Sequence, residues 1–259
     1  AACVAQGLAE ADLPGDAVQL VDTPDRAAVA ELLKLDEHLD LCIPRGGESL
    51  IRAVVEQARI PVIKHYTGNC HVYVDAHADP DLAVSLCVNA KTQRPGVCNA
   101  AETILFHQDC VAPGMVQRVG EALAQEGVEL RGDTRTMSVL PDARPADESD
   151  WAAEYLDLIV ALRVVDSLDD AVAHINRYGS KHTDAIVTRD LAAADRFVQT
   201  VDTANAMVNC STRFSDGQQY GLGAEIGIST DKLHARGPMG AADLTTTKWV
   251  ARGDGQIRE

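Results

Sequence analysis

Short apolar runs alternate along this 259-residue chain with longer segments whose apolar positions recur at helical spacing. A short apolar run bounded by turn residues is typical of a strand, and apolar residues three and four apart are typical of an amphipathic helix. Strands that alternate with helices indicate βαβ units and a parallel sheet, so the predicted fold class is α/β. The predicted strands cover residues 17–21, 39–44, 60–65, 71–76, 102–107, 155–166, 184–188, 204–209 and 244–251.

Capping signals mark where several helices begin. Thr23-Pro24 and Asp79-Pro80 each place a capping side chain before a proline, which suits the first position of a helix. Ser167 opens a stretch that resembles a capping box. The predicted helices cover residues 25–35, 48–58, 81–91, 112–127, 190–201 and a segment from 168 onward, whereas 131–153 is expected to be irregular.

Charge and cysteine content narrow the function classes. The chain has 23 basic and 39 acidic residues, and a net charge of −16 repels phosphate backbones and anionic lipid. We therefore expect no nucleic-acid or membrane role, and an anionic substrate would need a local basic pocket. The seven cysteines are odd in number and form no CxxC pair, so a disulfide framework or zinc site is not expected, and a reducing cytoplasmic compartment is.

One cysteine stands in a setting that suits a nucleophile. In "KTQRPGVCNAAETILFH", Cys98 follows a Pro-Gly turn and precedes a predicted strand, with Lys91 and Arg94 upstream. Nearby cations and a polar turn favour a thiolate. A buried structural cysteine fits the same spacing, so the residues alone leave both interpretations open.

Two further features could contact a nucleotide. Arg45, Gly46, Gly47 and Ser49 follow a predicted strand and open a helix, where backbone N–H groups can bind phosphate, although an ordinary βα turn is equally consistent. Glu154 directly precedes a long apolar strand, where a carboxylate could reach a ribose. The sequence contains no HExxH or GxSxG motif, and no metal site is expected.

Three long stretches resemble one enzyme family. "HLDLCIPRGGESLIRAVVEQARIPVIKHYTGNCHVYVD", "VNAKTQRPGVCNAAETILFH" and "GLGAEIGISTDKLHARGPMG" are similar to the gamma-glutamyl phosphate reductase (glutamate-5-semialdehyde dehydrogenase) family of proline biosynthesis, within the aldehyde dehydrogenase superfamily. The chain looks like the C-terminal part of that family. The resemblance implies an aldehyde-dehydrogenase-like fold with a partial Rossmann-like parallel sheet, an α/β catalytic domain and a C-terminal oligomerisation strand. The implied domains are 1–67 (NADP-binding), 68–227 (catalytic), 228–247 (return to the NADP-binding domain) and 248–259 (oligomerisation strand).

The resemblance also implies a reaction and a cofactor. Cys98 is expected to attack L-glutamyl 5-phosphate and form a thioester, which NADPH reduces to L-glutamate 5-semialdehyde. The implied cofactor-binding residues are Arg45, Gly46, Gly47 and Ser49 at the pyrophosphate and Glu154 at the nicotinamide ribose. Lys91 or Arg94 is expected to steady the leaving phosphate, and Ser211, Thr212 and Arg213 to hold the amino-acid end of the substrate.

One departure from the wider superfamily bears on the reaction type. Aligned on Gly68, "IKHYTGN" places His65 where hydrolytic aldehyde dehydrogenases carry the glutamate that activates water. A hydrolytic enzyme is therefore disfavoured, because a thioester that must be reduced has to be protected from water. Two different interpretations of the chain stay open: a truncated non-catalytic fragment, and the reductase region of a bifunctional kinase–reductase. A homo-oligomer and functional coupling to glutamate 5-kinase are the expected partners.

Overall fold

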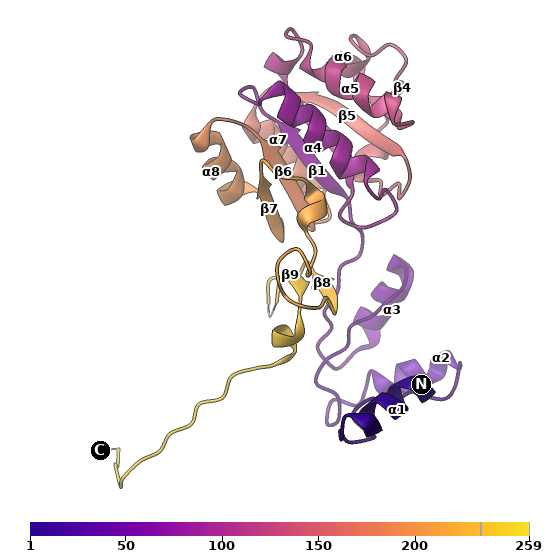
Figure 1. Ribbon diagram of the computed structural model, residues 1–259, viewed down its shortest axis with the longest axis vertical. Helices are drawn as coiled ribbons and strands as arrows, with labels where there is room; N and C mark the ends of the chain where they lie inside the picture. Colours follow the sequence, from indigo (N-terminus) through magenta and orange to yellow (C-terminus); the bar gives the residue numbers. More distant parts are fainter. Residues whose placement is uncertain (234, 259) are drawn as a thin grey trace. The chain divides into compact units, whose positions relative to one another are not determined.

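The computed structural model describes residues 1–233 and 235–258, which form two compact units (Figure 1). The small unit comprises residues 1–42 and 52–62, and the sheet unit comprises residues 43–51 and those from 63 onward. The predicted division with boundaries after 67, 227 and 247 stays a prediction. Its residues 234 and 259 lie outside the described residues.

The sheet unit is built on seven parallel strands in the order β4-β3-β5-β2-β1-β6-β7. The α/β class with a parallel sheet is therefore confirmed. The first strand in sequence, β1, lies inside the sheet because β2 pairs with it on one side and β6 on the other. The strands are β1 (Cys70–Val74), β2 (Ala101–His107), β3 (Glu129–Gly132), β4 (Arg144–Pro145), β5 (Ile159–Val165), β6 (Thr183–Val187) and β7 (Asn205–Val208).

Helices follow the strands, and two of them begin where Asp79 and Ser167 predict. The cap predicted at Thr23 is wrong, since Asp25 caps α2 (Arg26–Leu32) instead. The Asp79 carboxylate accepts hydrogen bonds from the backbone N–H groups of Asp81 and Leu82, and the Ser167 hydroxyl accepts one from Asp170. These caps satisfy N–H groups that the first helical turn leaves without partners. The helices are α4 (Pro80–Thr92), α5 (Met115–Gln125), α6 (Thr134–Met137), α7 (Leu168–Tyr178) and α8 (Leu191–Thr200).

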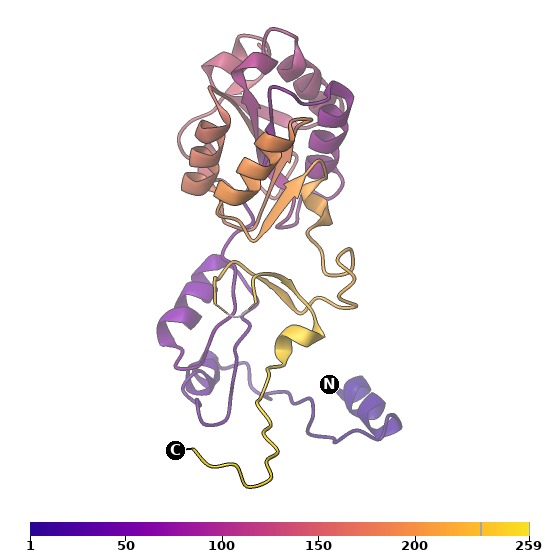
Figure 2. The ribbon, with the colours of Figure 1, turned by 90° about the vertical axis from the view of Figure 1, so that its left-hand side faces the viewer.

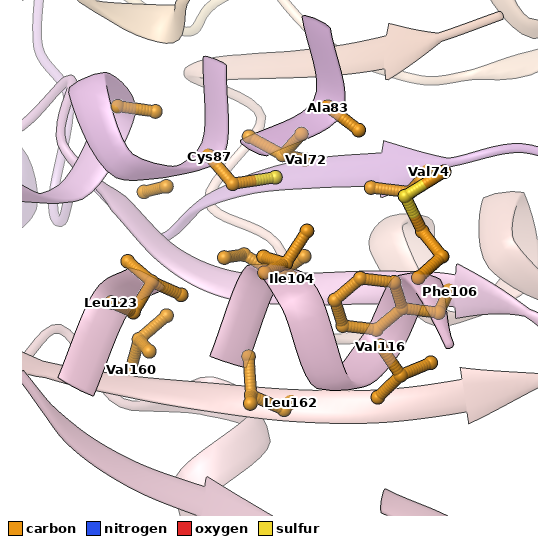
Figure 3. Packing of buried hydrophobic residues seen from close by; sticks show 14 of the residues in the cluster. Val72, Val74, Ala83, Cys87, Ile104, Phe106, Val116, Leu123, Val160 and Leu162 are labelled. Atoms are coloured by element: carbon orange, nitrogen blue, oxygen red, sulfur yellow. The ribbon is translucent and has the colours of Figure 1, made fainter. Parts of the chain in front are cut away.

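The core of this unit has two layers because helices cover both faces of the sheet (Figure 2). On the α4–α5 face, Val72, Ile104 and Phe106 pack against helix residues such as Leu123 (Figure 3). On the α7–α8 face, a second cluster forms from alternate strand positions and includes Tyr73, Leu105, Ile186 and Phe197. Burial on both faces explains why these strands read as nearly continuous apolar runs in the sequence.

Short elements complete the sheet unit. β8 and β9 pair in antiparallel orientation, and single-turn 3₁₀ helices lie in the connections. Their bounds are η1 (Gln108–Cys110), η2 (Asp150–Ala152), η3 (Thr212–Phe214), β8 (Gly227–Ser229), β9 (Gly237–Met239) and η4 (Ala241–Leu244).

The small unit is helical and has its own apolar cluster. α1 (Ala2–Glu10) and α2 (Arg26–Leu32) belong to it, and α3 (Glu48–Gln57) enters it at residue 52. Leu33, Val54 and Ile60 form the buried centre of the cluster.

Four predicted strands are wrong. Residues 39–44 and 60–65 meet only in a single parallel bridge, between Cys42 and Val62. Residues 17–21 form no strand, and Leu20 is 73% exposed. Residues 244–251 pair with no strand among the described residues, and Trp249 is fully exposed. A strand needs a neighbour along its length to accept and donate its ladder hydrogen bonds, and these segments lack one. The predicted role of 248–259 in oligomerisation stays a prediction.

The segment expected to be irregular holds regular structure as well. β3 ends within residues 131–153, and α6, β4 and η2 lie inside that range. These elements are too short to show a recognisable period in the sequence.

Candidate active site

Cys98 lies in the turn between α4 and β2, at the amino ends of the central strands. The thiol of Cys70, the first residue of β1, donates to the Cys98 carbonyl oxygen at 3.1 Å. Gly68 approaches so closely that a Cβ on it would overlap the carbonyl oxygen and Cα of Cys98. Cys70 and Gly68 therefore both contact the Cys98 backbone and fix its position.

Glu154 fixes Gly68 in this arrangement. One Glu154 carboxylate oxygen accepts the Gly68 backbone N–H at 2.7 Å. Because Gly68 contacts Cys98 directly, this hydrogen bond also sets where the cysteine turn sits. The predicted contact of Glu154 with the nicotinamide ribose stays a prediction, and the carboxylate is only partly exposed.

Three influences raise the pKa of the Cys98 thiol to about 11: burial first, then the charges of Glu154 and Glu225. The Cys98 backbone N–H and the Arg213 guanidinium act in the opposite direction. The thiol is therefore protonated at neutral pH in this arrangement. A nearby cation such as Arg213 favours the thiolate but offsets only part of this rise.

Two guanidinium groups lie near Cys98. Arg213, on η3, donates from Nε to the Gln93 side-chain oxygen at 2.8 Å, and burial followed by the charge of Arg94 lowers its pKa. Neither arginine forms an ion pair within the described part of the chain. The two positive charges favour an anion at this place, although the charge of Asp216 raises the pKa of Arg213 and so offsets part of the effect of Arg94.

The neighbours of Arg213 are buried. Ser211 is 3% exposed and its hydroxyl accepts the Arg213 backbone N–H at 3.3 Å. Thr212 is fully buried, and its hydroxyl oxygen meets no hydrogen-bond partner among the described residues. Both residues thus hold η3 in place, and their predicted contact with the substrate stays a prediction.

Lys91 lies beneath the site instead of facing it, which corrects the expectation that it could steady a phosphate. The ammonium group is fully buried and 2.6 Å from the carboxylate of Glu102, whose other oxygen accepts the Leu156 N–H at 3.3 Å. Burial raises the pKa of Glu102 to about 7, against the opposing effect of Lys91. A buried ion pair is costly to open, so of the two predicted cations only Arg94 is exposed to an incoming anion.

The turn predicted to bind the cofactor keeps exposed backbone at the start of α3. Arg45 donates to the Ile226 carbonyl oxygen at 2.5 Å, which ties the turn to the β8 hairpin. Gly46 has φ +154°, in the region that favours glycine, and Gly47 and Ser49 are exposed. N–H groups at a helix start attract phosphate, so these residues fit the pyrophosphate of a dinucleotide.

His65, which aligns with the water-activating glutamate of hydrolytic relatives, contacts the β8 backbone and a second histidine. Its Nδ1 lies 3.2 Å from the Ile228 carbonyl oxygen, and its ring meets the buried ring of His182 edge-on at 5.6 Å. Cys70, His182, Glu102 and Glu225 were not singled out by the sequence. Their partners come from other elements of the fold, such as Cys98 for Cys70 and Gly217 for Glu225, and no local sequence pattern marks these pairs.

Two features are absent from the described residues. No helix among them is long and apolar enough to cross a membrane. No three histidine, cysteine, aspartate or glutamate side chains there gather as metal ligands would.

Comparisons with known proteins agree on one family. The model of the aldehyde dehydrogenase family matches residues 1–138. Curated gamma-glutamyl phosphate reductases from Geotalea daltonii and Geobacter metallireducens are 58% identical over 247 residues and 57% identical over 249 residues, respectively. These alignments cover 95% and 96% of this chain and 59% of each relative, so the chain spans about three fifths of their length.

Solved structures give the same result. The crystal structure of gamma-glutamyl phosphate reductase from Thermotoga maritima superimposes with a TM-score of 0.95 at 46% identity, covering 100% of this chain and 62% of that one. An engineered glycolyl-CoA reductase with bound NADP+ has a TM-score of 0.65 at 18% identity, covering 91% of this chain and 61% of that one, and shares the fold.

Proposed function

Because this chain belongs to the aldehyde dehydrogenase family, we propose that it forms part of a cytoplasmic, NADPH-dependent reductase of L-glutamyl 5-phosphate. The products are L-glutamate 5-semialdehyde and inorganic phosphate. The observation that carries the proposal is the cysteine thiol on a fixed turn beside two arginines without carboxylate partners among the described residues. Curated relatives with that name support it, and the activity is that of the whole protein, of which this chain spans about three fifths.

The first step is attack by Cys98 on the acyl carbon. The sulfur forms a bond to that carbon, and the carbon–oxygen bond to phosphate breaks with its electron pair on phosphate. The thiol proton ends on the departing phosphate, which leaves as hydrogen phosphate. The product on the protein is a thioester. Arg213 favours this step because its charge lowers the pKa of Cys98, and the Cys98 N–H is the proposed donor to the oxyanion.

Each arginine is proposed to bind a different anionic group of the substrate. Arg94, exposed near the cysteine turn, is suited to hold the leaving phosphate, since a guanidinium binds phosphate oxygens in pairs. Arg213 is suited to the carboxylate at the amino-acid end, with Ser211 and Thr212 fixing its backbone. L-Glutamyl 5-phosphate carries a phosphate at one end and an α-carboxylate at the other, so it offers one anion to each arginine.

The nicotinamide, when bound, supplies the hydride that reduces the thioester. Arg45, Gly46, Gly47 and Ser49 would hold its pyrophosphate, and Glu154 would orient its ribose. Release of the aldehyde returns Cys98 to the thiol form. The absence of the water-activating glutamate favours reduction over hydrolysis, and the Nδ1 of His65, which takes its place in the sequence, lies 3.2 Å from the Ile228 carbonyl oxygen.

Further proposals concern partners. An acyl phosphate is an activated, water-sensitive molecule, so a kinase that phosphorylates glutamate must supply it, and coupling to glutamate 5-kinase follows. We also propose a homo-oligomer in which residues 248–259, which pair with no strand up to residue 258, pair with a second copy.

The test is the reverse reaction, measured on the full-length protein that contains this chain. NADP-dependent oxidation of glutamate 5-semialdehyde should require phosphate and should fall by about a thousandfold or more in Cys98→Ser. Cys3→Ser, an exposed cysteine, is the matched control and should keep the activity. Arg94→Ala should raise the KM for phosphate about tenfold. Oxidation that proceeds equally without phosphate would instead identify a hydrolytic aldehyde dehydrogenase.

A further inference from the structure

A cavity of about 310 Å³ lies in the sheet unit between β5, α6 and α7. Its lining includes Arg163, Val164 and Val165 from the carboxyl half of β5, whereas Cys98 precedes the amino end of β2. Ligands of open parallel sheets bind outside the carboxyl ends of the strands. No residue of the candidate active site lines this cavity. Its charged and polar lining includes Arg135, Arg163, Asp166, His174, Arg177 and Tyr178.

Arg163 is the lining guanidinium that forms no ion pair with any described residue. Arg135 pairs with Asp166, and Arg177 pairs with Glu148 at 3.0 Å. By contrast, Arg163 lies 5.2 Å from the centre of the Trp151 ring. The indole leaves the positive charge of Arg163 uncompensated, while the stacking fixes the plane of the guanidinium.

His174 holds the other side of Arg163. The Arg163 Nη1 donates to His174 Nδ1 at 2.9 Å, so the histidine proton resides on Nε2. His174 is 5% exposed, and its Nε2 has no hydrogen-bond partner among the described residues. Burial, with the charges of His71, Arg163 and Arg177, lowers the pKa of His174 to about 2, so the ring is neutral. It orients the guanidinium without adding or removing charge.

Asp170 at the exposed rim is the one lining carboxylate not engaged by an arginine, within the described residues. It accepts a hydrogen bond from the Ser167 hydroxyl at 2.8 Å and lies in the first turn of α7. The charge left uncompensated inside the cavity is therefore that of Arg163. A fixed, partly buried guanidinium of this kind recognises the paired oxygens of a carboxylate or phosphate.

We propose that this cavity binds a small metabolite-sized oxyanion, carboxylate or phosphate, with Arg163 as its principal contact. The volume is at the lower end of small-molecule sites, about 300–1,000 Å³, which suits such a ligand. The site is separate from the proposed reaction in both residues and position, so its ligand does not need to be a substrate.

The chain provides its own optical probe. It contains two tryptophans, Trp151 beside Arg163 and the fully exposed Trp249. In a Trp249→Phe background, Trp151 fluorescence should change saturably when inorganic phosphate or succinate is added at constant ionic strength set with sodium chloride. Saturation with phosphate alone, succinate alone or both supports the site and identifies the preferred oxyanion.

Three variants locate the signal. Arg163→Met should weaken binding about tenfold or more, because it removes a charge-assisted pair of hydrogen bonds, and Arg163→Lys should recover part of the affinity. Arg196→Met is the matched control, since that arginine pairs with Asp169 outside the cavity, and it should leave Kd within about twofold. If Arg163→Met does not fold, Arg163→Lys decides alone, with an expected loss of about threefold to fivefold.

Three results would overturn the proposal. The first is the absence of a saturable change for either anion. The second is an unchanged Kd in the Arg163 variants. The third is a signal lost in Arg94→Ala but kept in Arg163→Met, which would assign phosphate binding to the active site.

Discussion

The position of Cys98 depends on the absence of a side chain at Gly68. Gly68 has no Cβ, and only for that reason can its backbone lie against the Cys98 carbonyl while Glu154 accepts its N–H at 2.7 Å. Three residues from distant parts of the sequence therefore meet in one small volume. The reactivity of the cysteine is set by this contact as much as by the cations around it.

Replacement of Gly68 by alanine should disrupt this contact. The added Cβ would overlap the backbone of Cys98, and backbone cannot rotate away as a side chain does. We expect the alkylation rate of Cys98 by iodoacetamide to change by about tenfold or more, together with loss of activity in the whole protein. The rate is followed by mass spectrometry of the Cys98 peptide.

Gly96→Ala is the matched control in the same turn. Its Cβ would lie 3.6 Å from the Leu156 carbonyl oxygen, an ordinary contact, so alkylation of Cys98 should be almost unchanged. Equal behaviour of the two variants would contradict the packing argument.

At the same scale, the sequence predicted the site only in part. The charges of Arg94 and of Cys98 both act on Arg213, and the substrate contacts predicted for the two arginines stay predictions. Lys91 differs because Glu102, eleven positions later, captures it in a buried pair. Spacing along the chain cannot show which of two neighbouring cations the fold turns inward.

Helix α5 stabilises the sheet by packing apolar side chains against one of its faces. Leu123 is fully buried and packs with Ile104 and Val160 of the strands beneath it (Figure 3). Leu123→Ala should lower the free energy of unfolding by about 2–5 kcal/mol, since it removes buried methyl groups and leaves a cavity. Urea unfolding followed by circular dichroism measures this loss.

Leu191→Ala is the control at the element scale. Leu191 is the first residue of α8 and is 82% exposed, so the change should stay within about 0.5 kcal/mol. A loss as large as that of Leu123→Ala would mean that burial does not determine the cost.

Prediction of elements succeeded where packing and local signals agree. β1, β2, β5, β6 and β7 were predicted because each is apolar on both faces and follows or precedes a capped helix. Residues 17–21 have equally apolar side chains, but no neighbouring strand accepts their hydrogen bonds. The pairing partner of a strand is a property of the whole fold, which the local pattern does not contain.

The whole molecule should respond to acid through its buried histidines. Burial, with the charge of His65, lowers the pKa of the fully buried His182 to about 3, far below the value near 6.5 of an unfolded chain. A lowered folded-state pKa means that the unfolded state takes up the proton first, so this contribution to stability is lost as pH falls below about 6.5.

His182→Gln isolates that contribution. The wild-type protein should lose about 2 kcal/mol more than the variant between about pH 7 and about pH 5, because only the wild type has this proton to exclude. Urea unfolding of both proteins at the two pH values gives the difference. Other groups, Glu102 among them, change both proteins equally, and identical pH dependence would refute the assignment.

The strand order has a consequence for the newly made chain. β5 lies between β2 and β3, although it is synthesised after both, and β6 completes the pairing of β1 across more than a hundred residues. A nascent chain that has emerged only as far as residue 157 can pair β1 with β2 but leaves β3 without its inner neighbour. Until β5 and β6 emerge from the ribosome, β2 lacks its β5 neighbour and β1 lacks its β6 neighbour. These unpaired strand edges favour aggregation, and we expect chaperones to bind there.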